Sequence, residues 1–137
     1  MKFSETAYFK TSTYQTQDLG FGVLYLFDAF FISEINSGTH LDQGKVESLM
    51  DTLNNFYGKD AEICFISNRV NSYSSNPQLW VKALEHFDIF YAGAIVFYNL
   101  TNLMNFEIES RMCPKQVKGF SSLEEAIEWT KAIKATS

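Results

Sequence analysis

The segment FFISEINSGTHLDQGKVESLMDTL, residues 30–53, decides the fold. It begins with a run of aromatic and β-branched residues, Phe30 to Ile35, which is typical of a strand. Residues 37–39 (SGT) interrupt the strand, and Asp42 is a suitable N-cap for a helix that Gly58 would end. Apolar residues recur between these two caps at helical spacing. They are Val46, Leu49, Met50, Leu53 and Tyr57. The segment therefore predicts a strand, a turn and an amphipathic helix.

The residues before this segment predict an antiparallel hairpin. Phe21 to Phe27 is a second aromatic strand, and Asp28 and Ala29 form a tight turn between it and the strand from Phe30. Residues 3–9 alternate with period two, which predicts a further strand, and the polar segment 11–18 predicts a loop. We therefore expect residues 1–18 to be either an N-terminal strand or an arm.

Downstream, single strands alternate with helices. Strands are expected at residues 62–67, 92–98 and 115–120, and helices are expected to begin at Pro77, near Leu100, and after the capping box Ser122-x-x-Glu125. The inner faces expected for these three helices are Leu79, Trp80, Ala83, Leu84 and Phe87; then Leu100, Leu103, Met104, Ile108 and Met112; then Leu123, Ala126, Ile127, Thr130 and Ile133. Crossovers through helices make the strands that they join parallel. We expect a single α/β domain over residues 1–137, with a mixed, mostly parallel sheet, an N-terminal antiparallel hairpin and about four helices.

Composition excludes several classes of protein. Hydrophobic residues make up 46% and aromatic residues 16% of the chain, which is too apolar for a disordered polypeptide. The net charge of -5 disfavours nucleic acid and favours a basic partner. No apolar run is long enough for a membrane span or a signal peptide, so we expect a cytoplasmic protein. In such a compartment Cys64 and Cys113 are expected to be free thiols.

The sequence also lacks motifs for catalysis or for cofactor binding. It contains no glycine-rich phosphate loop and no Gly-x-Ser-x-Gly. His40, Asp42 and His86 do not have the spacing of metal ligands, and His40 is interpreted as a residue that flanks a helix start. We therefore expect no enzyme activity, no metal and no cofactor.

Four strings, in this order along the chain, resemble the STAS superfamily. They are FFISEINSGTHLDQGKVESLMDTL, EICFIS, AGAIVFY and FSSLEEAIEWTKAI, and the resemblance covers roughly residues 20–134. This superfamily includes anti-sigma-factor antagonists such as SpoIIAA-like proteins and the cytoplasmic tails of sulfate transporters. The resemblance implies a STAS-like fold and a non-catalytic regulatory domain that binds another protein.

The resemblance also points to the loop after EICFIS. In anti-sigma-factor antagonists a serine at this place is phosphorylated by the partner kinase, and Ser74 and Ser75 match that place here. We take the loop as a phosphoacceptor or partner-binding site; its candidate residues are Arg69, Ser72, Tyr73, Ser74 and Ser75. A phosphoryl group there would meet the N–H groups of the following helix, and Arg69 would pair with it or with an anionic ligand. The alternative is that Ser75 or Asn76 only caps the helix, Tyr73 packs on the surface and Arg69 is solvated.

The aromatic residues of the hairpin suggest a second site. Phe21, Tyr25, Phe30 and Phe31 make both faces of the hairpin apolar in places, whereas one layer of helices covers only one face. The second face would then be an interface with a second copy of the chain, which gives a homodimer. Alternatively, it would line a pocket for a small apolar, lipid-like ligand, and the protein would bind or sense that ligand.

Overall fold

The computed structural model describes residues 1–86, 89–112 and 115–136. Within these residues a six-stranded sheet has the order β1-β2-β3-β5-β7-β8. Its strands are β1 (Gln15–Asp18), β2 (Gly22–Leu26), β3 (Phe30–Ile35), β5 (Ile63–Asn68), β7 (Phe90–Val96) and β8 (Gln116–Phe120). The first three strands pair antiparallel, and β3, β5, β7 and β8 pair parallel. The predicted mixed sheet with an antiparallel hairpin is confirmed.

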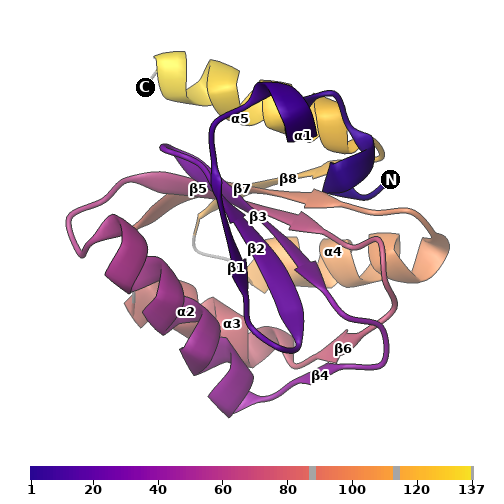
Figure 1. Ribbon diagram of the computed structural model, residues 1–137. Coiled ribbons are helices and arrows are strands. Elements are labelled where there is room, and N and C mark those ends of the chain that lie inside the picture. The colour runs from indigo at the N-terminus through magenta and orange to yellow at the C-terminus, as the bar shows by residue number, and fades with distance from the viewer. Residues whose placement is uncertain (87–88, 113–114, 137) are drawn as a thin grey trace.

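Helices cover both faces of the sheet (Figure 1). One face carries α2 (Gln43–Tyr57), α3 (Pro77–His86) and α4 (Leu100–Met112). The other face carries α5 (Leu123–Thr136) and two short N-terminal turns, η1 (Phe3–Glu5) and α1 (Tyr8–Thr11). Each face has its own cluster of buried apolar side chains, as the alternation of side chains along a strand requires.

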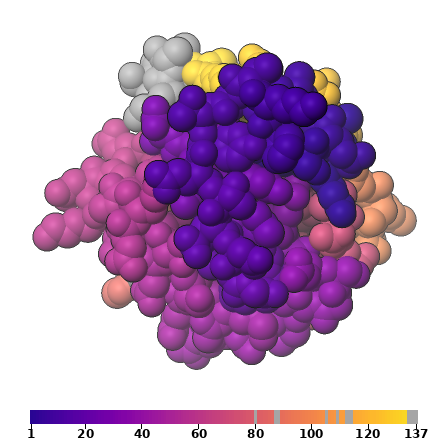
Figure 2. All heavy atoms as spheres, in the orientation of Figure 1, coloured from indigo at the N-terminus to yellow at the C-terminus, as the bar shows by residue number. Residues whose placement is uncertain are grey.

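The N-terminal segment differs from its prediction. Residues 3–9 form η1 and the start of α1 rather than a strand. The reason is that the Phe3 side chain inserts alone into the apolar core, instead of belonging to a row of side chains on one face of a strand. The Phe3 ring is 0% exposed and packs against the rings of Phe9, Tyr14, Tyr25 and Phe27. In Figure 2 the indigo N-terminal atoms lie against the yellow atoms of α5 at the top of the molecule. The N-terminal segment is therefore part of the helical layer on this face.

The predicted loop 11–18 is also wrong, because its second half is the edge strand β1. All four residues of β1 are exposed, and the strand pairs with β2 from Gln15–Leu26 to Asp18–Val23. Backbone hydrogen bonds rather than apolar side chains make this strand. An apolar alternation, which is the usual signal of a half-buried strand, is therefore missing from its sequence.

A buried polar network ties the N-terminal segment to the sheet. The backbone N–H of Phe3 and the side-chain amide of Asn68 both donate to Glu34 Oε2, each at 2.7 Å. The Tyr98 hydroxyl lies 2.5 Å from Asn68 Oδ1 and 3.0 Å from the carbonyl oxygen of Met1. Burial, followed by the negative charge of Glu34, raises the pKa of Tyr98 to about 12.

Helix α2 has the predicted caps and inner face. Asp42 Oδ1 accepts a hydrogen bond from the backbone N–H of Lys45 at 3.0 Å, and Gly58 ends the helix with a φ of 87°. The predicted face contains the three buried residues Val46, Met50 and Leu53 and the half-buried Leu49 and Tyr57.

Helices α3 and α5 also begin where the sequence predicts. In α3 Leu84 is buried and Leu79 and Ala83 are half-buried, while the buried Val81 was not predicted. The side chain of Trp80 and residue Phe87 lie outside the described residues. In α5 Ser122 Oγ accepts from the backbone N–H of Glu125, and the predicted face is buried or half-buried. Its members are Leu123, Ala126, Ile127, Thr130 and Ile133.

The inner face predicted for α4 is wrong at three of its residues; Leu103 is half-buried, and the side chain of Met112 lies outside the described residues. Leu100, Met104 and Ile108 are 70%, 55% and 52% exposed. Phe106 packs inward instead, with its ring 6.1 Å from that of Phe97. Gly119 makes room for both rings, because a Cβ there would lie 2.9 Å from each of them. The apolar residues of α4 are distributed around the whole helix, so their spacing alone does not identify the face that contacts the sheet.

Cys64 is buried and forms no disulfide with a described residue, and Cys113 lies outside the described residues. No helix in the described part of the chain has the length and apolar character needed to cross a membrane.

Candidate functional site

A cavity lies between the sheet and α2 and α3, toward the carboxyl ends of the parallel strands β3 and β5. Every second residue of these strands faces it, as the period of a strand dictates. These residues are Phe31, Ser33 and Ile35 from β3, and Phe65, Ser67 and then Arg69 from β5 and the residue after it. Ser33 and Ser67 are register partners, so the two rows run side by side. Ligands of open α/β sheets commonly bind at this end of the strands.

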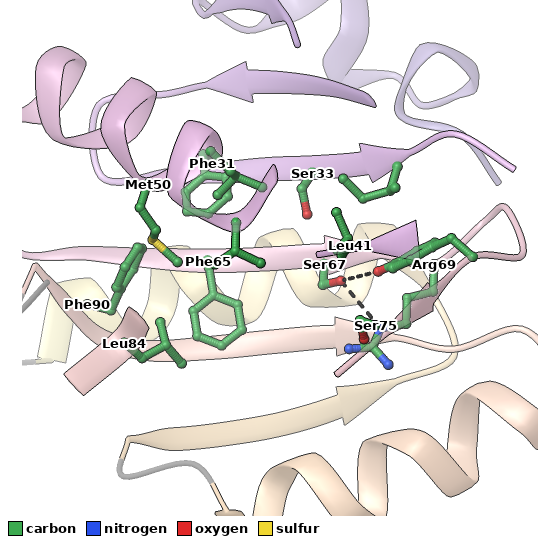
Figure 3. Close-up of a pocket in the computed structure, with 14 residues that line it drawn as sticks. Phe31, Ser33, Leu41, Met50, Phe65, Ser67, Arg69, Ser75, Leu84 and Phe90 are labelled. Atoms are coloured by element: carbon green, nitrogen blue, oxygen red, sulfur yellow. Dashed lines mark hydrogen bonds between the residues drawn. The ribbon is translucent and has the colours of Figure 1, made fainter. Parts of the chain in front are cut away.

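The remaining walls come from α2 and α3, from the loop after β5, from the residue Leu41 ahead of α2 and from the first residue of β7. They are Leu41, Val46, Leu49, Met50, Tyr73, Ser75, Leu84 and Phe90. The cavity is partly open and has a volume of about 80 Å³. Figure 3 shows that Met50, Phe65, Leu84 and Phe90 gather at one end, whereas Ser67, Arg69 and Ser75 lie at the other end. The cavity therefore has an apolar end and a polar end.

Arg69 is the charged residue of the polar end. It is only 8% exposed, so the alternative interpretation in which it is solvated is wrong. Its Nε donates to Ser67 Oγ at 3.4 Å, and the hydroxyls of Ser67 and Tyr73 lie 3.4 Å apart. Arg69, Ser67 and Tyr73 thus form a group of hydrogen-bonding side chains in the cavity wall.

A small ladder holds the loop after β5 in place. β4 (His40–Leu41) pairs parallel with β6 (Ser74–Ser75) in a second, two-stranded sheet within the described residues. The loop is also held by the hydrogen bond from the Gly38 backbone N–H to the Ser72 carbonyl, at 2.8 Å. Along this extended loop the side chains alternate: Ser72 and Ser74 are exposed, while Tyr73 and Ser75 line the cavity. The candidate loop residues thus divide into an outer face and a cavity face.

The ladder brings Ser74 beside His40, and no sequence pattern connects this histidine with the loop. His40 Nδ1 lies 2.7 Å from Ser74 Oγ. Asp42 is nearby but bonds to the backbone N–H and the Nζ of Lys45, and these two bonds hold the pKa of its carboxyl below the usual range. When a histidine activates a serine nucleophile, a third group orients the imidazole ring. Asp42 does not have this role toward His40, because its carboxylate accepts hydrogen bonds from Lys45.

The N-terminus of α3 shows which residue acts as its cap. Asn76 Oδ1 accepts from the backbone N–H of Gln78 at 3.0 Å, so Asn76 rather than Ser75 has this role. No group of three or more His, Cys, Asp or Glu residues with the geometry of a metal site occurs among the described residues.

The four aromatic residues of the hairpin do not form one site. Phe31 is buried and lines the cavity, whereas Phe30 is buried on the opposite face and stacks on Phe27 at 4.3 Å. Tyr25 packs under Phe3, and Phe21 is half-buried. The N-terminal segment of the same chain covers the second face, so the expected open apolar interface at these residues is absent.

The structure brings four of the predicted site residues into one cavity, namely Arg69, Tyr73, Ser75 and Phe31, whereas Ser33 and Ser67 were not predicted as site residues. A signal for them does exist. The strings Phe31-x-Ser33 and Phe65-x-Ser67-x-Arg69 change from apolar to polar along one face of two strands that a helical crossover joins. Reading the two strings in register would have located the polar end.

Comparisons with known proteins bear on the fold. No family model and no curated protein matches the chain. A solved structure does match: it is an uncharacterized protein from the DUF3478 family with a SpoIIAA-like fold, from Shewanella loihica PV-4. The two share 15% sequence identity with a TM-score of 0.52, over 86% of this chain and 92% of that chain. At this identity the match speaks for the fold alone, and it confirms the resemblance drawn from the sequence: the chain has a SpoIIAA-like, STAS-type fold.

Proposed function

We propose that the protein is a non-catalytic regulatory domain that binds a protein partner through the outer face of the loop after β5. The observation that carries this proposal is the alternation along the loop. Ser72, Ser74 and Asn76 are exposed, although the loop is held by the β4–β6 ladder and by its cavity-facing side chains. A held loop loses little conformational entropy when it binds. The net charge of -5 favours a basic partner surface.

Within this loop we assign the regulatory modification to Ser74 rather than to Ser75. The Ser74 side chain is exposed, whereas Ser75 lines the cavity. A phosphoryl group on Ser74 would add about two negative charges at the centre of the outer face. It would also lie beside His40, which could pair with it when protonated. Phosphorylation of Ser74 would therefore weaken binding to an acidic partner surface and strengthen binding to a basic one.

The test is the capture of partners by the full chain from extract of the native cell. Ser74→Asp should change which proteins are captured, and Ser48→Asp, which adds the same charge on the exposed side of α2, should not. Ser75→Asp should act through the cavity and lower stability. If neither loop substitution alters any captured protein, the loop is not the binding site. Sedimentation velocity on dilute protein would show whether the partner is a second copy of the chain.

A second candidate function, the binding of a small apolar ligand, is favoured by the cavity. Its walls are mainly apolar, and it lies at the sheet edge where α/β folds commonly bind ligands. Its volume of about 80 Å³ is well below what a lipid chain needs. A ligand of a few carbon atoms fits this space better than a lipid.

A further inference from the structure

We propose that a cleft between the edge strand β1 and helix α2 binds a neutral sugar ring. The Phe56 ring would lie against the C–H face of the sugar, and the amide side chains of Gln15 and Asn55 would bind its hydroxyl groups. The cleft shares no residue with the cavity described above or with the loop after β5, so the inference goes beyond both candidate functions. It follows from the position, the chemistry, the charge and the size of the cleft.

The register of β1 explains how the cleft forms. Gln15 pairs with Leu26 and Gln17 pairs with Leu24, and paired residues of antiparallel strands point to the same face of the sheet. Both leucines belong to the buried cluster under α2, so both glutamines lie on the face that α2 covers. All four residues of β1 are nevertheless exposed, so α2 does not reach over the edge strand. A cleft remains between β1 and α2, which lie side by side in Figure 1.

The opposite wall of the cleft is one side of α2. Thr52, Asn55 and Phe56 are three and four residues apart, which places them beside one another on a helix. The Phe56 ring is 40% exposed, and its centroid lies 4.8 Å from that of the Tyr57 ring. The Tyr57 hydroxyl lies 2.6 and 2.9 Å from two carbonyl oxygens of the turn between β2 and β3. The exposed ring is therefore supported by a second ring that is anchored to the sheet.

The polar groups of the cleft suit hydroxyl groups. An amide side chain offers donors and an acceptor, and a sugar hydroxyl is likewise both a donor and an acceptor. Gln15 and Asn55 are exposed amides on opposite walls of the cleft, so a ligand between them can bond to both. The Thr52 hydroxyl donates to the carbonyl oxygen of Ser48 at 2.9 Å, which leaves its oxygen able to accept from a ligand. The cleft thus offers both kinds of hydrogen-bonding group.

The charge and the single aromatic ring select the ligand class. None of the described residues that line the cleft is charged, so an ion would lose hydration there without gaining a partner of opposite charge. Phe56 is the one ring of this lining, and the other exposed walls are amides and hydroxyls. A pyranose has the same division, with C–H groups on one face and hydroxyl groups around its rim. A nucleobase is apolar on both faces and would leave one of them against polar groups.

The size of the cleft agrees with one sugar ring. Its volume is about 340 Å³, which lies within the range of about 300–1,000 Å³ that is usual for ligand sites. A cavity of about 150 Å³ holds benzene, which has six non-hydrogen atoms, so a hexopyranose with twelve needs roughly 300 Å³. Because the cleft is open to solvent on one side, we expect weak binding.

The first experiment titrates the unmodified protein with the methyl glycosides of glucose, galactose and mannose, and follows backbone amide signals by NMR. We expect at least one glycoside to shift the signals of Thr52, Asn55 and Phe56 with a dissociation constant on the order of 1 mM. Cyclohexanol has a ring of the same size with a single hydroxyl group, so it should bind at least about tenfold more weakly. Glucose 6-phosphate and adenosine should bind more weakly than the best glycoside.

The second experiment titrates variants with the best glycoside. Phe56→Ala should weaken binding about tenfold or more, whereas Phe56→Tyr keeps the ring and should keep the affinity. Asn55→Ala should weaken binding about three- to tenfold, because it removes hydrogen bonds to the ligand. Asn54→Ala makes the same change at the neighbouring residue, which does not line the cleft, and should leave the affinity unchanged. If a variant does not fold, the comparison of the glycosides with cyclohexanol still decides the question in the unmodified protein.

Four results would overturn the inference. Equal affinity for cyclohexanol would show that the cleft does not recognise hydroxyl groups. Tighter binding of adenosine or of glucose 6-phosphate would replace the neutral sugar by a flat base or by an anion. Equal weakening by Asn54→Ala and Asn55→Ala would place the effect outside the cleft. If no glycoside shifts the signals of the cleft residues, the sugar site does not exist, while the protein-binding proposal and the second candidate function concern other residues and stand on their own tests.

Discussion

Replacing Phe3 by alanine should remove a large part of the stability of the domain. The Phe3 side chain is fully buried and meets four rings, with centroid distances of 5.8 Å to Phe9, 5.1 Å to Tyr14, 4.6 Å to Tyr25 and 5.6 Å to Phe27. Truncation of a buried phenylalanine typically costs about 3–5 kcal/mol. Small domains have a total free energy of unfolding of about 5–15 kcal/mol, so the variant should be close to the limit of folding.

Urea denaturation of the full chain, followed by far-UV circular dichroism, measures this loss. With a slope of about 1–3 kcal/mol per molar urea, the midpoint should fall by roughly 2 M. Phe56→Ala is the matched control, since Phe56 is 40% exposed on α2, and it should cost less than about 1 kcal/mol. A loss below about 1 kcal/mol for Phe3→Ala would show that the N-terminal segment does not cover this face in solution.

Two further predictions concern the cavity and the polar network. Gly93→Ala should lower the free energy of unfolding by about 1–3 kcal/mol, because the added methyl group would overlap the Phe65 ring. The displaced ring would enter the cavity, so the variant should also lose binding there. An unchanged thermal unfolding midpoint would contradict this prediction. The pKa of Tyr98 is raised from 10.0 to about 12, so the stability linked to it is complete below pH 10 and is lost as the pH rises through about 12. Tyr98→Phe should therefore lose less stability than the unmodified protein over this pH range, which denaturation midpoints measured at several pH values would show.

The regular part of the fold was predictable because local signals and burial agree there. Asp42 caps the start and Gly58 the end of a helix whose apolar residues recur on one face, and Ser122 caps the start of another helix of the same kind. The short apolar run at β5 is bounded by polar residues, as a buried strand requires. In these elements the cap residues, the apolar residues and the polar residues each indicate the same local structure that tertiary packing requires.

The remaining elements depend on partners that are distant in the sequence. Phe3 is buried by rings up to 24 residues away along the chain, and β1 exists only because β2 offers its edge. His40 and Ser74 meet across 34 residues through a ladder of two residue pairs, which has no hydrophobic pattern of its own. Arg69 is buried because it continues the row of cavity-facing residues Phe65 and Ser67 beyond the end of β5. In the sequence it is a single arginine in a polar loop, which gives no sign of burial.

The two outer strands of the sheet determine how readily two molecules of this chain could pair edge to edge. An edge strand offers unpaired backbone groups to other chains, and flat apolar edges promote aggregation. Here β1 presents only Gln, Thr and Asp side chains, all of them exposed, and β8 exposes Gln116 and Lys118. A second molecule that added a strand at either edge would have to desolvate these polar groups. The edge strand β1 thus offers no aromatic ring to a second sheet, and at β8 the Phe120 ring packs against Trp129 and lies under the Lys118 ammonium group.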